Sequence, residues 1–176
     1  MRLTPVQEKF ILHWGEMGTR WGITRSMAQI QALLLLSPEP LNAEEIASTL
    51  SVARSNASIS LRDLQAWGIV RVAHVLGDRR DHFETIKDPW ALFRVILEER
   101  KRREIDPTIA ALNQCLEGAT EEDSEARERI AEMLEFFELT SAWYRAVGRL
   151  PDKALIRFVK LGDKVPKVLG LDGEDD

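Results

Sequence analysis

The chain has 176 residues, of which 44% are hydrophobic and 30% charged, which is typical of a folded globular protein and excludes a largely disordered one. No apolar run approaches the roughly 20 residues that a membrane span needs, and the first residues lack the apolar core of a signal peptide. We therefore expect a cytoplasmic protein with no membrane partner. The single cysteine, Cys115, excludes an internal disulfide bond and a cysteine-built zinc site. Its apolar neighbours predict that it is buried.

The net charge of −5 is distributed unevenly along the chain. Residues 1–50 carry a net charge of −1, residues 51–103 carry +4, and residues 104–176 carry −8. The negative total argues against a nucleic-acid partner. However, a basic middle followed by an acidic C-terminal third suggests two roles in one chain.

Two helices are predicted at the start of the chain. Thr4 is expected to cap the first, with Pro5 at the tolerated first position and Gln7 completing a capping box. The second is predicted over 24–36 and is stopped by the segment SPEP. Three glycines are expected to end the first helix before the second begins: Gly15, Gly18 and Gly22.

A short third helix and a longer fourth follow with almost no connection between them. Asn42 and Glu45 predict a capping box for the third helix, which is expected to end near Leu50. Ser51 is expected to cap the fourth, which runs to Trp67. Since only one or two residues separate these helices, they must meet at a steep angle.

The hydrophobic period then changes to that of strands. Residues 69–76 are rich in β-branched side chains, Gly77 and Asp78 signal a turn, and residues 82–86 are expected to return as a second strand. This is the only convincing hairpin. Everything after it is predicted to be helical, with helix starts at Pro89, at Asp106-Pro107, at Thr120 with Asp123, and at Pro151.

The order of these elements is that of a winged helix-turn-helix. We therefore predict a mainly α fold with one β-hairpin (α+β), with a winged helix-turn-helix DNA-binding domain over residues 1–87. Residues 88–170 are predicted to form a helical dimerisation and regulatory region, and residues 171–176 an acidic tail.

The fourth helix has a polar face opposite its apolar stripe. Ser55 and Arg62 lie on that face and are flanked by Arg54, Asn56 and Ser58. The N-terminal end of such a helix enters a major groove, where its backbone N–H groups are available to a phosphate.

The tip of the hairpin carries Arg79 and Arg80, which suit a narrow minor groove. The flanking Asp78 and Asp81 partly cancel the positive field of these arginines.

On the fourth helix, Ile59 also falls on the DNA side. An apolar side chain there either contacts a thymine methyl group or shows that the assigned face is rotated.

The same segment resembles a known family. The resemblance is carried by G-x-x-R (Gly22 to Arg25) entering a helix that ends in LLLLSPEP, and by ARSNASISLRDLQAWGIV. Over about residues 5–105 the chain resembles the GbsR-type branch of the MarR-like winged helix-turn-helix regulators. That resemblance implies a homodimeric, DNA-binding transcriptional regulator, often a repressor, in which the helices outside the core form the dimer.

The resemblance also assigns roles to residues. It implies that the bases are read by Arg54, Ser55, Asn56 and Ser58, that Arg62 contacts the phosphate backbone, and that Arg79 and Arg80 form the wing contact. The segment DRRD is less basic than the wing of many relatives, which weakens the case for tight wing binding.

An apolar stripe runs along the long helix of the acidic C-terminal third. Periodicity alone leaves open whether this stripe packs onto the chain's own core or forms a dimer, and the resemblance favours a dimer. Two recognition helices about 34 Å apart would then read a palindrome. The residues expected in the dimer interface are Ile130, Leu134, Phe137, Trp143, Tyr144 and Val147.

Five tryptophans are many for this length. They are either core and interface anchors or the wall of a site for a cationic small-molecule effector, for which Trp14, Trp21 and Trp90 are the candidates.

The sequence has no Gly-rich phosphate loop and no H-E-x-x-H pattern. We therefore expect no catalytic residues, no metal and no cofactor.

Taken together, these patterns predict a sequence-specific regulator that binds double-stranded DNA as a homodimer. The helix 51–67 is expected to read a palindromic operator, and the wing at 76–82 is expected to contact its minor groove. The alternative is a winged-helix scaffold that binds a protein rather than DNA, which the acidic charge balance favours.

Overall fold

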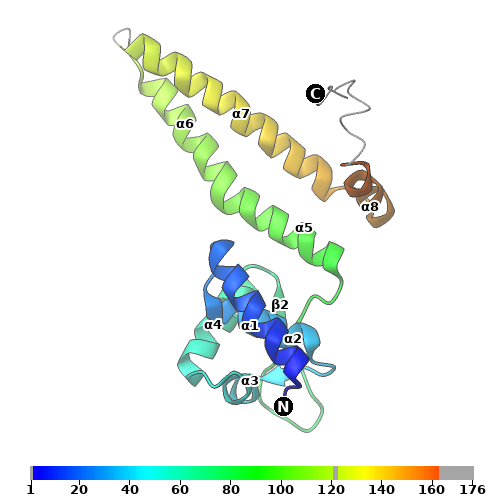
Figure 1. The fold of residues 1–176 in the computed structure, drawn as a ribbon. Coiled ribbons are helices and arrows are strands. Elements are labelled where there is room, and N and C mark those ends of the chain that lie inside the picture. The colour runs from blue at the N-terminus through cyan, green and yellow to red at the C-terminus, as the bar shows by residue number, and fades with distance from the viewer. Residues whose placement is uncertain (1, 121–122, 163–176) are drawn as a thin grey trace, which may run out of the picture. The chain divides into compact units, whose positions relative to one another are not determined.

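The computed structural model describes residues 2–120 and 123–162. Its contacts divide the chain into two units, the first ending at Ile96 and the second beginning at Leu97. The predicted division lies earlier, at residue 87. The described part is mostly helical with one small antiparallel sheet, as predicted (Figure 1). None of its helices is long and apolar enough to cross a membrane.

The first unit opens with α1 (Pro5–Arg20) and α2 (Arg25–Leu36). The capping box of Thr4 and Gln7 is confirmed. Gly22 follows the end of α1 with a positive φ of 83°, as predicted, but the prediction that Gly15 and Gly18 end the helix is wrong. Gly15 and Gly18 lie inside α1 and are buried. A Cβ atom on Gly18 would stand 2.3 Å from that of Ala28, so glycine there lets the two helices approach closely.

The helix-turn-helix is formed by α3 (Ala43–Leu50) and α4 (Arg54–Ala66). Asn42 caps α3 as predicted. Ser51, however, does not cap α4. It ends α3 in the left-handed conformation, with φ of 54°, and α4 begins only after Ala53, which offers no side-chain cap. Ser51 thus belongs to the turn, which spans residues 51–53.

Three strands form the sheet, in the order β1 (Leu41–Asn42), β3 (His82–Thr85) and β2 (Val70–Ala73). Phe83 on β3 pairs with Leu41 on one side and with Val72 on the other. The hairpin is confirmed, although its first strand is shorter than predicted. β1 was not predicted, because two residues carry no readable alternation.

The core of the first unit is built around α2. Ile30, Leu33 and Leu34 are almost wholly buried and pack with Ile46 of α3 and Leu61 of α4. The start of α5 (Pro89–Arg100) packs against this core through Leu92, Val95 and Ile96.

The second unit contains the π-helical segment η1 (Lys101–Ile105), α6 (Asp106–Gly118), α7 (Ser124–Gly148) and α8 (Asp152–Leu161). The predicted helix start at Asp106-Pro107 is confirmed, since α6 begins at Asp106 with the proline in its first turn. It follows η1 directly, however, with no loop before it. Pro107 has no N–H group to donate, and the wider π turn accommodates it, with the Asp106 N–H bonding to the carbonyl of Lys101.

α6 and α7 pack against each other. α7 begins at Ser124 rather than at Thr120, whose N–H and hydroxyl instead donate to the Asp123 carboxylate at 2.9 and 2.8 Å. Cys115 is exposed on α6, so the prediction that it is buried is wrong. The predicted acidic tail, 171–176, lies outside the described residues.

Candidate nucleic-acid interface

The solvent-exposed face of α4 carries the residues that the sequence assigns to DNA. Arg54, Ser55, Asn56 and Arg62 are exposed, and Ser58 is half-buried. The opposite face packs into the core through Ala57, Ser60, Leu61 and Leu64. Ile59 is 51% exposed and lies on the same side as Ser55 and Arg62. The polar face is therefore oriented as predicted.

Two polar contacts tie the beginning of α4 to neighbouring helices. The Asn56 amide donates to the Ser26 hydroxyl of α2 at 3.0 Å. Arg54 lies 3.2 Å from the carboxylate of Glu44, in the first turn of α3. Asn56 and Arg54 are thus preoriented at the N-terminal end of α4.

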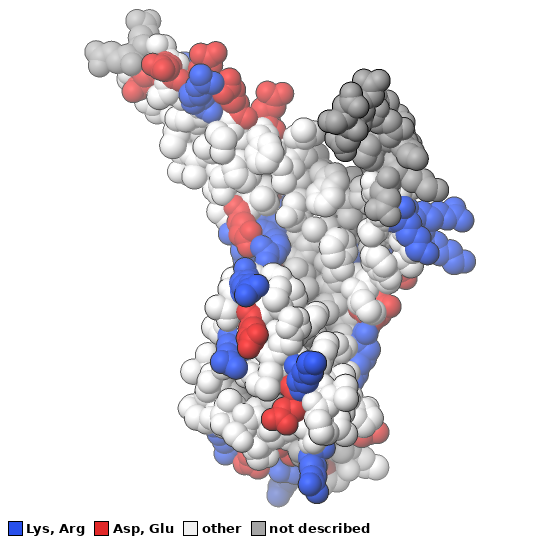
Figure 2. Space-filling view, in the orientation of Figure 1, with Lys and Arg blue, Asp and Glu red and all other residues white. Residues whose placement is uncertain are grey.

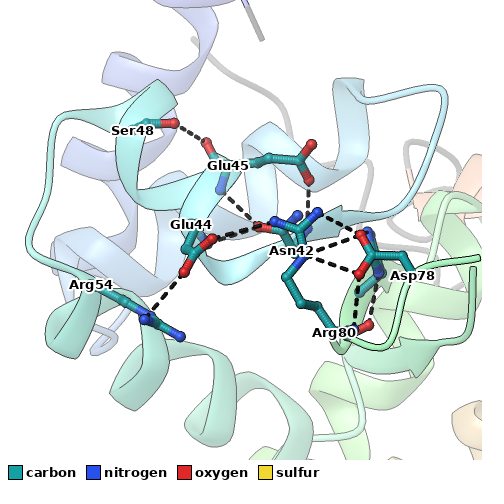
Figure 3. A network of polar contacts seen from close by, with 8 residues as sticks. Asn42, Glu44, Glu45, Ser48, Arg54, Asp78 and Arg80 are labelled. Atoms are coloured by element: carbon teal, nitrogen blue, oxygen red, sulfur yellow. Dashed lines mark hydrogen bonds and ion pairs between the residues drawn. The ribbon is translucent and has the colours of Figure 1, made fainter.

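The wing is the loop 74–81 between β2 and β3. Arg80 donates to both carboxylate oxygens of Asp78 and lies 3.3 Å from Glu44 (Figure 3). These bonds hold the pKa of Asp78 well below its usual range and raise that of Arg80. Arg79 is exposed and makes no ion pair within the described residues. The two wing arginines are therefore not equivalent.

A chain of ion pairs consequently runs from the wing to α4. Glu44 shares its two oxygens between Arg54 and Arg80, and Asp78 completes the chain. Glu44, Arg54 and Arg80 border a hollow of about 270 Å³ that is also lined by Ser58 and Phe83. Blue and red atoms are accordingly interspersed over this end of the first unit (Figure 2).

Glu44 is part of this site but is not predicted from the sequence. Its only sequence signal is an acidic residue in the first turn of a helix, which is common because carboxylates there favour the helix dipole. Its pairing with both arginines depends on α3, α4 and the wing converging, which no local pattern reveals.

Of the three candidate effector tryptophans, Trp14 and Trp21 lie together and Trp90 does not contact them within the described residues. Trp14 and Trp21 pack edge to face with ring centroids 5.1 Å apart, and the Trp14 indole donates to Gln31 at 2.7 Å. Trp90 is half-buried on α5 and makes no ring contact with them in the described part of the chain. Trp14 therefore helps to pack α1 onto α2. An effector site remains a prediction.

The six candidate dimer residues lie on α7, and five of them are at least half-buried within the single chain. Only Trp143 is exposed. A neighbouring set of apolar side chains is more exposed: Met133, Phe136 and Leu139 of α7, with Phe158, Val159 and Leu161 of α8.

Among the described residues no group of three or more acidic, His or Cys side chains is placed to hold a metal ion.

This arrangement of helices and sheet defines a winged helix-turn-helix protein, and comparison with known proteins agrees. Residues 21–81, just over a third of the chain, match the model of the MarR family. The match spans α2 to the wing. The comparison with curated proteins finds no match.

One solved structure shows the fold over most of the chain, and two others are less similar. A crystal structure described as that of a transcriptional regulator is 21% identical, covers 89% of this chain and 99% of its own, and superposes with a TM-score of 0.65. A Staphylococcus aureus MepR mutant bound to an oligodeoxyribonucleotide is 16% identical, covers 74% of this chain and 91% of its own, and has a TM-score of 0.39. A MarR protein from Peptoclostridium difficile is 13% identical, covers 81% and 86%, and has a TM-score of 0.38.

Proposed function

We propose that this chain is a DNA-binding transcriptional regulator of the MarR type, and that it belongs to the GbsR-type branch. The observation that carries the proposal is the exposed polar face of α4 beside an arginine-bearing wing. The MarR match over 21–81 and the regulator with the same fold support it.

In the proposed complex, the N-terminal end of α4 lies in the major groove. Arg54, Ser55, Asn56 and Ser58 contact base edges there, because short polar side chains and arginine pair with donors and acceptors in that groove. Arg62, two turns along the helix, contacts the phosphate backbone and contributes affinity rather than sequence preference.

In this complex the wing lies along the adjacent minor groove. Arg79 is the side chain available for it, since Arg80 is already bound to Asp78 and Glu44. The negative charge of those two carboxylates repels a phosphate, so Arg80 contributes less affinity than an unpaired arginine does.

The functional form is a homodimer that reads a palindrome. The exposed apolar side chains of α7 and α8 support this proposal, because contiguous exposed apolar surface marks interaction sites. The side of α6 and α7 turned to the viewer in Figure 2 is largely uncharged. Isologous pairing through such a surface relates the two α4 helices by a two-fold axis.

The regulator is proposed to act as a repressor whose affinity for DNA is controlled by a cationic effector. The supporting observation is the aromatic cluster at Trp14 and Trp21, since aromatic faces attract quaternary ammonium groups. Binding that changes the spacing of the two recognition helices would shift the DNA-competent population. Quenching of tryptophan fluorescence by a quaternary ammonium ligand, lost in Trp21→Ala, tests this role.

Selection from a random duplex pool tests the proposed function. The wild-type protein is expected to enrich a palindromic motif, and the Arg54→Ala/Arg62→Ala variant is expected to enrich none. Arg127→Ala/Arg129→Ala removes the same charge from exposed positions of α7 and serves as the matched control. Failure of the wild-type protein to enrich any duplex contradicts the proposal.

A second function is favoured by one observation. The pairing of Arg80 and Arg54 with acidic neighbours reduces the basic character of the DNA-facing surface, which suits a winged-helix scaffold that binds a protein. That function predicts no effect of Arg54→Ala/Arg62→Ala in any DNA-binding measurement.

A further inference from the structure

Ile59 has no part in the contacts proposed above, although it lies in the middle of the exposed face of α4. Ser55 precedes it by four residues and Arg62 follows it by three, so all three share one helix face. The buried stripe through Ala57 and Leu61 fixes the rotation of the helix. The alternative that the assigned face is rotated is therefore wrong.

The folded chain gives no reason for isoleucine at this position. Its side chain is 51% exposed, so it gains only part of the free energy of full burial. Isoleucine is also a poorer helix former than the straight-chain residues that usually occupy exposed helix positions. A contact with a partner accounts for the residue better than packing does.

The groove that α4 is proposed to enter offers one apolar group. Among the base edges in a major groove, only thymine presents a methyl group, at C5. Ile59 lies about 7.5 Å along the helix axis from Arg54 at the helical rise per residue. It is therefore within the same groove as the N-terminal contacts and beside the bases that they read.

We propose that Ile59 recognises a thymine through contact with its C5 methyl group, once in each half-site. The inference rests on the proposed function and names a base preference within it. Uracil keeps every hydrogen-bonding group of thymine and lacks only that methyl group, so replacing thymine by uracil isolates this contact.

The experiment uses the duplex that the wild-type protein selects from a random pool. Each thymine is replaced by uracil in turn, and dissociation constants are measured for the wild type, Ile59→Ala and Leu76→Ala. Each half-site is expected to contain one thymine at which a single replacement by uracil weakens wild-type binding about fourfold, the effect of losing one buried methyl group. Ile59→Ala is expected to bind the thymine and uracil duplexes equally.

Leu76→Ala is the matched control, because Leu76 is a fully exposed apolar residue on the wing. A wing in the minor groove does not meet the thymine methyl group, so this variant is expected to keep the wild-type thymine-to-uracil ratio. Ile59→Val keeps part of the side chain and is expected to give an intermediate ratio. Circular dichroism checks that each variant is folded.

Two results overturn the inference and separate it from the proposed function. If Ile59→Ala keeps the wild-type ratio, or if no uracil substitution weakens binding, the thymine contact is wrong while DNA binding stands. If no duplex is enriched from the pool, the proposed function fails, and the inference fails with it.

Discussion

The guanidinium of Arg80 donates to both carboxylate oxygens of Asp78, with Nε at 3.0 Å from each and Nη2 at 2.5 Å from Oδ2. The backbone N–H of Arg80 also donates to Oδ1. The two residues thus close a tight turn at residues 78–80 of the wing. This pairing fixes the conformation of the loop and partly neutralises the arginine that the sequence assigns to DNA.

Asp78→Asn is therefore expected to strengthen DNA binding. The substitution releases Arg80 to a phosphate, and each added phosphate contact steepens the dependence of log K on log salt by about 0.9. Anisotropy titrations at several salt concentrations measure that slope. Asp81→Asn makes the same charge change on an exposed residue with no ion pair in the described chain, and it is expected to leave the slope nearly unchanged. An equal change of slope in both variants would contradict the role of the pair.

The Asp78–Arg80 contact is expected to persist in mild acid. Because the pKa of Asp78 is held below its usual range by Arg80, the contact is fully present above the ordinary Asp value of about 3.9. It is lost only as the pH falls through the lower folded value. Carbon-13 NMR of the Asp78 carboxyl group is expected to show it mostly ionised at about pH 3.9, where an ordinary aspartate is half protonated. A protonation midpoint at or above that pH would contradict the depressed pKa.

Gly18→Ala is expected to destabilise the first unit. The new Cβ atom would stand 2.3 Å from that of Ala28, so α1 and α2 must separate, and overpacking of this kind costs about 1–3 kcal/mol. Urea unfolding monitored by circular dichroism measures the change. Gly148→Ala is the control, because a Cβ atom there meets no other atom within 4 Å. Equal stability of Gly18→Ala and the wild type would show that the helices are not in close contact.

Phe136→Glu/Leu139→Glu is expected to dissociate the proposed homodimer. The two side chains are 59% and 71% exposed, and four charges at a two-fold interface repel one another while removing apolar contact area. Sedimentation equilibrium is expected to give a dimer for the wild type and a monomer for the variant. Ala126→Glu places a charge at an exposed position of the same helix and is expected to remain dimeric. A dimeric double variant would place the interface elsewhere.

The sequence predicts well where a local signal determines the structure. The caps at Thr4 and Asn42 and the hairpin are confirmed, because each depends on side chains within three residues or on a tight turn. The prediction that Gly18 ends α1 is wrong for a different reason. A glycine that allows helices to pack and a glycine that ends a helix look alike until the neighbouring helix is known.

The candidate site shows the same limit. The exposed face of α4 follows from the spacing of Ala57, Leu61 and Leu64, and the sequence predicts it correctly. The pairing of Glu44 with Arg54 and Arg80 joins α3, α4 and the wing. Contacts between residues up to 36 positions apart leave no periodic signal in the sequence.

The most direct test of sequence-specific DNA binding through α4 is one set of anisotropy titrations. The wild type, Arg54→Ala/Arg62→Ala and Arg127→Ala/Arg129→Ala are each titrated onto the selected duplex and onto a scrambled duplex of the same composition. The account predicts a preference of roughly 10³-fold or more for the selected duplex, kept by the α7 control and lost by the α4 variant. Equal binding of both duplexes by the wild type, or a preference that survives in the α4 variant, would contradict it.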